Sequence, residues 1–207
     1  MTISFCDDRG ERGFSWIVDE PMTRTSHALA ADGRVWLVDA VRFPAAIERA
    51  RRLGEPAAVL QLLDRHNRDC ASLAAELGVP HLVVPATLPG TPFECISVRA
   101  SKRWNEVALW WPTEQTLVVA EALGTNRFFT SEDDAAGVHL LLRLSPPREA
   151  LGRFEPEHLL VGHGPGLHGQ AATDGLRTAL ARSRTGIPRL LVKAPAFAVD
   201  AVRRRRR

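Results

Sequence analysis

The sequence predicts an α+β fold in which two sheets face each other and helices lie outside. Predicted strands 26–31 and 34–40 flank a turn signal at Asp32-Gly33, which indicates a hairpin. A strand–helix–strand unit follows over residues 57–84. More strands and a final strand–helix pair complete the chain. This order does not suit a doubly wound sheet and favours a layered arrangement.

Local signals predict each element. Helix 44–53 has a proline at its start and Gly54 after its end, and helix 70–77 closes at Gly78-Val79-Pro80. Residues 135–144 fit a helix or a strand. The other predicted strands are 13–18, 57–63, 81–84, 94–99, 106–111, 116–120 and 158–161, and the other predicted helices are 146–154 and 170–184.

Composition indicates a soluble globular protein. The chain has 207 residues, of which 45% are hydrophobic and 25% charged. With no linker between the predicted elements, we expect one domain over residues 1–202. No apolar run reaches membrane-spanning length, and the first ten residues are too polar for a signal peptide. Three cysteines without framework spacing favour a reducing cytoplasm.

The net charge of +3 is concentrated at the end of the chain, because five positive charges lie in residues 203–207. Without them the chain is close to neutral, so the pI near 9.1 does not indicate a basic binding face. We expect a solvated, disordered tail and no nucleic-acid partner.

Residues 62–70 (LLDRHNRDC) lie between a predicted buried strand and a predicted helix. That layout resembles the metallo-β-lactamase superfamily, whose metal loop T-H-x-H-x-D-H connects a strand to a helix. The histidine positions of that loop hold Arg65, Asn67 and Cys70 here, and only Asp69 matches.

Three further fragments carry the resemblance. Residues 26–39 look like the family's opening hairpin, which ends in an aspartate, here Asp39. Residues 117–123 look like the strand before the family's bridging aspartate, with Glu121 in its place, and His163 in Gly162-His163-Gly164 matches the terminal metal histidine. The resemblance implies a four-layer αββα sandwich.

The resemblance also implies that the first of two metal sites is lost. Its ligand positions hold Arg65, Asn67 and Lys102. Arginine and protonated lysine have no lone pair to donate, and two cations repel a divalent ion. They can instead neutralise Asp69 and Glu121 or hold an anionic ligand such as a phosphate or carboxylate.

The second set of positions holds Asp69, Cys70, Glu121 and His163. Two carboxylates, a thiolate and an imidazole suit one zinc or iron ion. Asp69, Arg65 and Lys102 are then the candidate catalytic residues, with a cation steadying an oxyanion. A metal-free network of the same charges is equally self-consistent.

His66 falls between the implied ligand positions and is interpreted as a loop residue, which becomes a ligand if the register slips by one. The remaining histidines are interpreted as structural: His27, His81, His139, His158 and His168.

The sequence therefore predicts a protein of hydrolase ancestry whose dinuclear site has been dismantled. It would hold at most one ion and catalyse weak or specialised hydrolysis of an unknown substrate. The alternative is a metal-free pseudoenzyme that binds an anionic small molecule or a protein partner.

Overall fold

The computed structural model describes residues 2–130 and 134–185. The predicted tail, 203–207, lies outside these residues, so its disorder stays a prediction. The first sheet has the order β1-β2-β3-β4-β5-β6. Its strands are β1 (Ile3–Cys6), β2 (Gly13–Val18), β3 (Thr25–Ala31), β4 (Arg34–Val38), β5 (Glu55–Gln61) and β6 (His81–Val83). Neighbours are antiparallel from β1 to β4 and parallel from β4 to β6.

The second sheet has the order β13-β12-β9-β8-β7. Its strands are β7 (Glu94–Ser101), β8 (Trp104–Trp111), β9 (Thr116–Val119), β12 (His158–Val161) and β13 (Leu167–His168). Only the β12–β9 pair is parallel within the described sheet. Strands β10 (Leu123–Gly124) and β11 (Gly137–Val138) form a separate pair.

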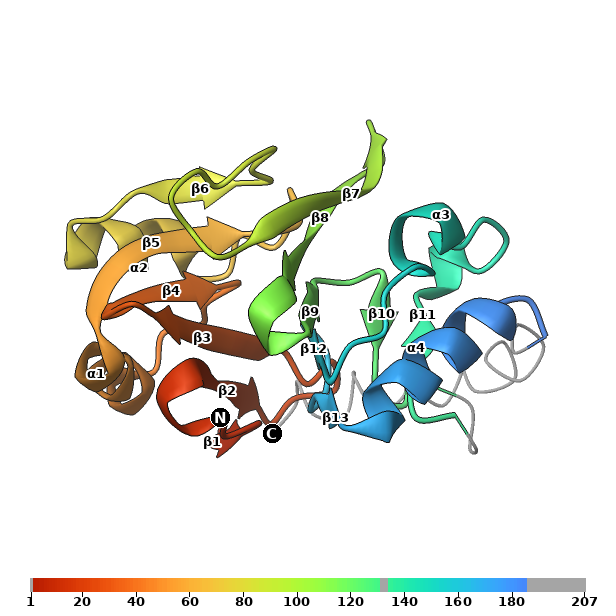
Figure 1. Ribbon diagram of the computed structural model, residues 1–207, viewed down its shortest axis with the longest axis horizontal. Coiled ribbons are helices and arrows are strands. Elements are labelled where there is room, and N and C mark those ends of the chain that lie inside the picture. The colour runs from red at the N-terminus through yellow and green to blue at the C-terminus, as the bar shows by residue number, and fades with distance from the viewer. Residues whose placement is uncertain (1, 131–133, 186–207) are drawn as a thin grey trace, which may run out of the picture.

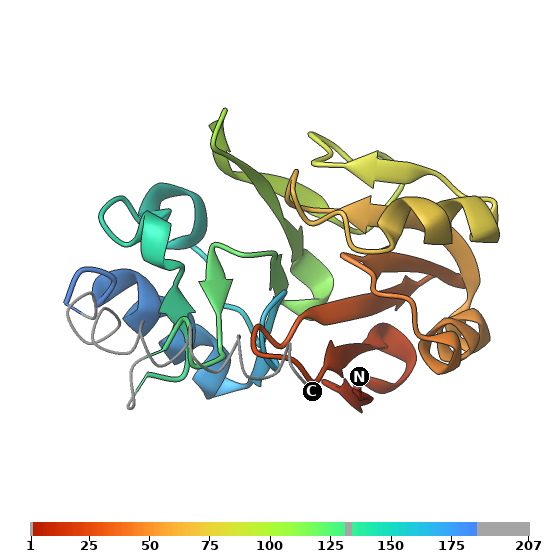
Figure 2. The same ribbon diagram turned by 180° about the vertical axis from the view of Figure 1, so that it is seen from behind.

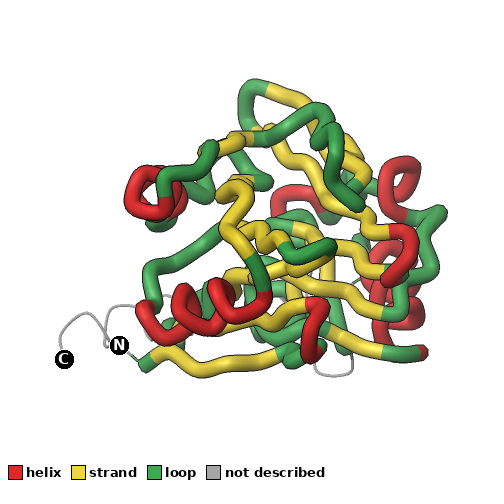
Figure 3. The backbone as a smooth tube through the Cα atoms, turned by 60° about the vertical axis from the view of Figure 1, so that its left-hand side comes forward, coloured by secondary structure: helices red, strands yellow, loops and turns green. Residues whose placement is uncertain are grey.

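Helices cover the outer faces of both sheets (Figures 1 and 2). Helices α1 (Pro44–Leu53) and α2 (Cys70–Leu77) pack on the first sheet, and α3 (Arg148–Leu151) and α4 (Gln170–Ala181) pack on the second. The tube view shows the strands between the helices (Figure 3). Short 3-10 turns are Gly10–Arg12, Pro112–Glu114 and Leu140–Leu142. No described helix has the length and apolar character needed to cross a membrane.

Strand β4 shows how the layers are held together. Its side chains alternate between two apolar clusters, because successive residues of a strand face opposite sides. Val35 and Leu37 pack under α1 and α2, whereas Trp36 and Val38 face the second sheet. Trp36 meets Phe93 edge to face with ring centroids 5.1 Å apart. Burial on both faces explains the nearly continuous apolar run of this strand.

The predicted αββα sandwich is confirmed, and α1 and α2 have the predicted bounds. The structure resolves the ambiguity at 135–144, which holds β11 and a 3-10 turn. Helix α3 is shorter than predicted because it begins only after Pro146 and Pro147. Strands β1, β10 and β13 were not predicted, since four or fewer residues give little periodicity.

Candidate metal centre

The two sheets are joined at the ends of two strands, and the candidate site lies between these junctions. After β5, Leu63 forms a bridge to Glu106 of β8, and Val107 N donates to Leu62 O at 2.9 Å. After β12, His163 forms a bridge to Arg24, just before β3. Each junction therefore fixes a loop of one sheet against the other sheet.

These two loops and the segment after β9 bring together His66, Glu121 and His163. One ligand atom from each lies within 4.8 Å of the others, and it is the only such group among the described residues. His66 Nε2 lies 3.7 Å from Glu121 Oε2. Both histidines are buried and Glu121 is partly buried. The group is therefore compact and largely shielded from solvent.

The Nδ1 atoms of both imidazoles are held by partners outside the cluster. His66 Nδ1 lies 3.1 Å from Asp39 Oδ2, and His163 Nδ1 lies 2.9 Å from the carbonyl oxygen of Met22. Metal-binding histidines commonly donate one N–H to a carboxylate or carbonyl in this way, which frees the other nitrogen as a ligand. His163 Nε2 is buried and has no hydrogen-bond partner in the structure. An orphaned buried nitrogen facing a carboxylate and a second imidazole fits a metal ion.

Asp39 organises the loop that carries His66. Its Oδ1 accepts a hydrogen bond from Leu62 N at 3.0 Å while Oδ2 holds His66. Burial alone would raise the pKa of Asp39, but the neighbouring His66 and Arg68 hold it below its usual range. The carboxylate therefore stays charged and orients the imidazole.

Arg68 places a fixed positive charge beside the cluster. Its guanidinium donates to the carbonyl oxygens of Thr25, Asp39 and Gly162, the last at 2.9 Å. Burial lowers the pKa of Arg68. Burial, followed by the charge of Arg68, also lowers the pKa of His163 to about 3, so His163 is neutral at physiological pH. A neutral imidazole is the form that binds metal.

Arg65 and His139 contact Glu121 from the rim. Arg65 Nε lies 3.3 Å from Glu121 Oε2, which is one of the pairings that the sequence left open between Arg65 or Lys102 and Asp69 or Glu121. The guanidinium carbon lies 4.1 Å from the ring centroid of Trp104. His139 Nε2 lies 3.6 Å from Glu121 Oε1, and burial lowers the pKa of His139. Sequence reasoning missed His139 because nothing local distinguishes it from a packed histidine.

Glu106 fixes the backbone next to Glu121. It is fully buried and accepts hydrogen bonds from Glu121 N, Ala122 N and Trp104 Nε1 at 2.9, 3.0 and 2.6 Å. Burial raises the pKa of Glu106. Glu106 thus positions a ligand without belonging to the cluster.

Of the four predicted ligands, the structure brings Glu121 and His163 together but not Asp69 and Cys70. Asp69 Oδ2 accepts from Arg42 N at 2.7 Å, on the side of α2. Cys70 Sγ is buried against Ala40 O at 3.8 Å, and burial raises its pKa to about 12. A thiol that stays protonated is a poor ligand. His66 occupies the cluster instead.

The other predicted positions lie at the periphery. Asn67 is exposed, although its Oδ1 lies 3.4 Å from Gln61 Nε2. Lys102 is exposed in the turn between β7 and β8. Neither belongs to the three-residue cluster.

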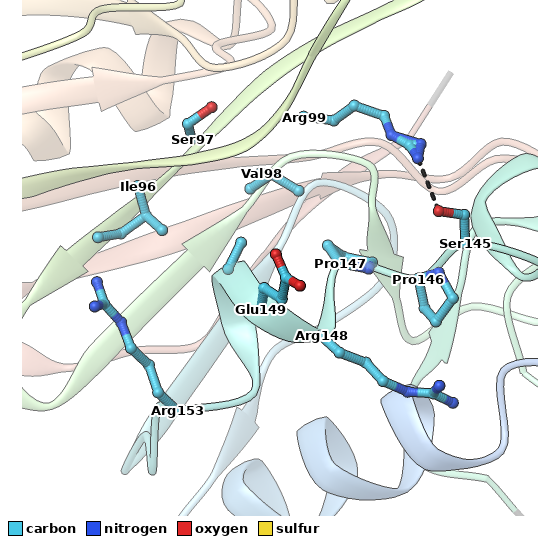
Figure 4. A pocket seen from close by; sticks show the side chains of 11 residues that line it. Ile96, Ser97, Val98, Arg99, Ser145, Pro146, Pro147, Arg148, Glu149 and Arg153 are labelled. Carbon is cyan, nitrogen blue, oxygen red and sulfur yellow. Dashed lines mark hydrogen bonds between the residues drawn. The ribbon is translucent and has the colours of Figure 1, made fainter.

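A separate open groove of about 640 Å³ lies between β7 and α3 (Figure 4). Three arginines line it, and none of the three clustered residues does. Arg99 Nη2 donates to Ser145 Oγ at 3.0 Å, and Arg148 donates to Leu180 O. Arg153 extends toward Ile96. The groove is basic but also contains Glu149.

No protein-family profile and no curated protein matches this sequence. Solved structures match its fold. A metallo-β-lactamase from Hirschia baltica aligns with a TM-score of 0.59 and 12% identity over 87% of this chain and 98% of that chain. DIM-1 metallo-β-lactamase exposed to ceftazidime aligns with a TM-score of 0.56 and 14% identity over 87% and 97%. TMB-1 aligns with a TM-score of 0.59 and 9% identity over 87% of this chain and 98% of that chain.

The chain therefore has the metallo-β-lactamase fold. At these identities the likeness concerns the arrangement of the backbone, because one fold can carry many activities. Function has to be argued from the residues of the site.

Proposed function

We propose that this protein is a hydrolase that uses a single metal ion held by His66, Glu121 and His163. The observation that carries the proposal is the buried, unpartnered Nε2 of His163, which faces the other two ligands. Two imidazoles and one carboxylate form a donor set used by catalytic zinc and by non-haem iron. Such an ion would supply Lewis acidity for hydrolysis.

The surrounding charges favour one ion over two. Arg68 and Arg65 approach the cluster from different loop positions, and each carries a permanent positive charge. Asp69, which we expected to bind the retained ion, is engaged by Arg42 N. A second divalent ion would meet two cations and lack a carboxylate, so the proposed site is mononuclear.

The residues of the chain have separate proposed roles around the reaction. Arg65 is partly exposed beside Glu121, where its guanidinium can stabilise negative charge that develops on a substrate. His139 Nδ1 accepts a hydrogen bond from Leu141 N, so its Nε2 carries the proton and directs it at Glu121 Oε1, where it would orient that carboxylate. Lys102, exposed in the neighbouring turn, would attract an anionic substrate over a longer range.

Metal analysis tests the proposal. Protein purified without a chelating column, loaded with zinc and dialysed against a weak chelator should retain one ion per chain. His163→Ala should abolish retention. Cys70→Ala is the matched control and should retain the ion, because the Cys70 thiol faces backbone carbonyls. Loss of zinc in Cys70→Ala would instead support the set Asp69, Cys70, Glu121 and His163.

The second candidate function is metal-free binding of an anion. It is favoured by the pairing of Glu121 with Arg65, which can neutralise the carboxylate without an ion. The arginine-lined groove offers a place for an anionic small molecule. Zinc-supplemented protein that is folded but retains no ion would favour this candidate over the hydrolase.

We also propose a cytoplasmic location and retain the single domain over residues 1–202 as a prediction. Cys6, Cys70 and Cys95 are all unpaired, which suits a reducing compartment. Mass spectrometry of the protein isolated from its own cells should find all three thiols reduced.

A further inference from the structure

A second pair of histidines lies across the edge of the second sheet. His158 of β12 and His168 of β13 are direct partners in the antiparallel register. Their Nδ1 atoms are 2.9 Å apart, and their ring centroids are 5.1 Å apart. His158 begins β12 whereas His163 follows its end, so five residues, roughly 16 Å of strand, separate this pair from the candidate metal centre.

Asp7 orients one ring of the pair from the other sheet. It follows β1, and its Oδ1 lies 3.3 Å from His168 Nε2 and accepts from Gly166 N at 2.9 Å. With Nε2–H donated to Asp7, the Nδ1 atom of His168 carries the lone pair. Metal-binding histidines commonly donate the N–H that does not face the metal to a carboxylate, which fixes the tautomer and the orientation of the ring.

We infer that His158 and His168 form a second, surface site for a divalent transition-metal ion, with Asp7 as its orienting partner. Two nitrogens bonded at about 2.0–2.1 Å and at right angles on one ion lie about 2.9 Å apart, which matches the observed separation. A right angle between two imidazole nitrogens suits the square-planar or tetragonal coordination of nickel and copper, whereas tetrahedral zinc holds its ligands at a wider angle.

Without an ion, the same contact is an N–H···N hydrogen bond from His158 to His168. Ion binding needs His158 to move its proton from Nδ1 to Nε2, and no proton is released overall. The side chain of His168 is 39% exposed, so water can complete the coordination of the ion.

The charges around the pair are mixed. Arg9 faces His158 but is paired with Glu114 at 3.8 Å, and Glu157 adds a further negative charge. Burial, followed by the charge of Arg9, lowers the pKa of His158, which keeps the ring neutral and available. Because an imidazole binds a metal ion only in its neutral form, metal binding at this pair should weaken in acid.

An ion at this site would tie β13 to β12 and, through Asp7, to the first sheet. Strands β1 and β13 are the edge strands of their sheets. The ion would thus act as a clip between two edges that are otherwise joined by few contacts, and it would stabilise the folded state in proportion to its occupancy.

Calorimetric titration of the zinc-loaded protein with nickel chloride tests this site. Wild type should bind one nickel ion and show a rise in Tm. His158→Gln and His168→Gln should each lose the binding and the rise, and Asp7→Asn should weaken affinity roughly tenfold. His81→Gln is the matched control, since His81 is a partly buried strand histidine held by Gln61.

Nickel binding that is unchanged in both His158→Gln and His168→Gln would overturn the site. So would loss of binding in His81→Gln alone. Zinc retention at His66, Glu121 and His163 is measured separately, so failure here and failure of the proposed hydrolase site are distinguishable.

Discussion

The loops that carry His66 and His163 reach the same cluster but are held in place by different means. The loop after β12 is shaped by glycines that fit against backbone. A Cβ at Gly162 would lie 2.2 Å from Ala120 O, and Gly164 has a φ of +100°. The loop after β5 has no such fit and is held by side chains, namely Asp39 on His66 and Arg68 on three carbonyls.

This difference separates steric from electrostatic positioning. A glycine packed against backbone leaves no room for a side chain, but its contribution to stability does not depend on pH or salt. Hydrogen bonds from a charged side chain, such as those of Arg68, tolerate small changes of shape but are lost with the charge and its donor groups. Substitutions in each loop should therefore have effects of different kinds.

The largest effect is expected from Arg68→Met. It leaves the backbone carbonyls of Thr25, Asp39 and Gly162 without their charged donor. The free energy of unfolding should fall by about 3–5 kcal/mol, since each acceptor left unpaired costs about 1–3 kcal/mol. Arg65→Ala is the control, because its 41% exposed side chain limits the loss to less than about 1 kcal/mol. Urea titration measures both, and equal losses would contradict the comparison.

Acid should destabilise the metal-free protein through buried histidines near Arg68. Burial lowers the pKa of His27 to about 4. In the unfolded chain His27 binds a proton near pH 6.5, whereas in the folded chain it stays neutral down to about pH 4. The stability that is present above pH 6.5 is therefore lost as the pH falls toward about 4. His27 alone should account for about 3 kcal/mol. Urea titrations at several pH values across this range give the free energy of unfolding as a function of pH. This free energy should fall less steeply with acid in His27→Gln than in wild type, and an identical fall in both proteins would refute the assignment.

Gly162→Ala tests the steric loop. The added methyl meets the backbone of Ala120, so we expect a loss of about 1–3 kcal/mol and weaker metal retention. Gly90→Ala is the control: it has positive φ but open space, and should cost only about 1 kcal/mol. A Gly162 variant as stable as the Gly90 variant would show that the loop moves freely.

The smallest expected effect on folding comes from Asp39→Asn, which keeps the shape but removes the charge beside His66. The amide oxygen can still accept from Leu62 N, so the fold should persist. Zinc affinity should fall by about 10–100-fold because the imidazole loses its orienting carboxylate. Competition with a chromophoric chelator measures this, and unchanged affinity would argue against His66 as a ligand.

The same contrast explains what could be predicted from the sequence. His163 was found because its signature, glycine on both sides, is local. The strand–helix frame around residues 62–70 was also local, and α2 has the predicted bounds. Whether His66 or Asp69 enters the site depends on Asp39 and Arg68, whose partners lie 27 to 94 residues away along the chain. One sequence carries no direct signal for such contacts.

Arg68 also bears on how this protein meets metal scarcity. The Arg68 guanidinium binds three carbonyl oxygens at this junction. Because the side chain is part of the chain, it cannot dissociate as a metal ion bound to the same oxygens could. The positive charge at this junction of the sheets is therefore present whether or not the cell supplies zinc or iron. Metal supply should then govern how many copies of the proposed hydrolase are active, while the metal-free chain still keeps this junction of the sheets intact.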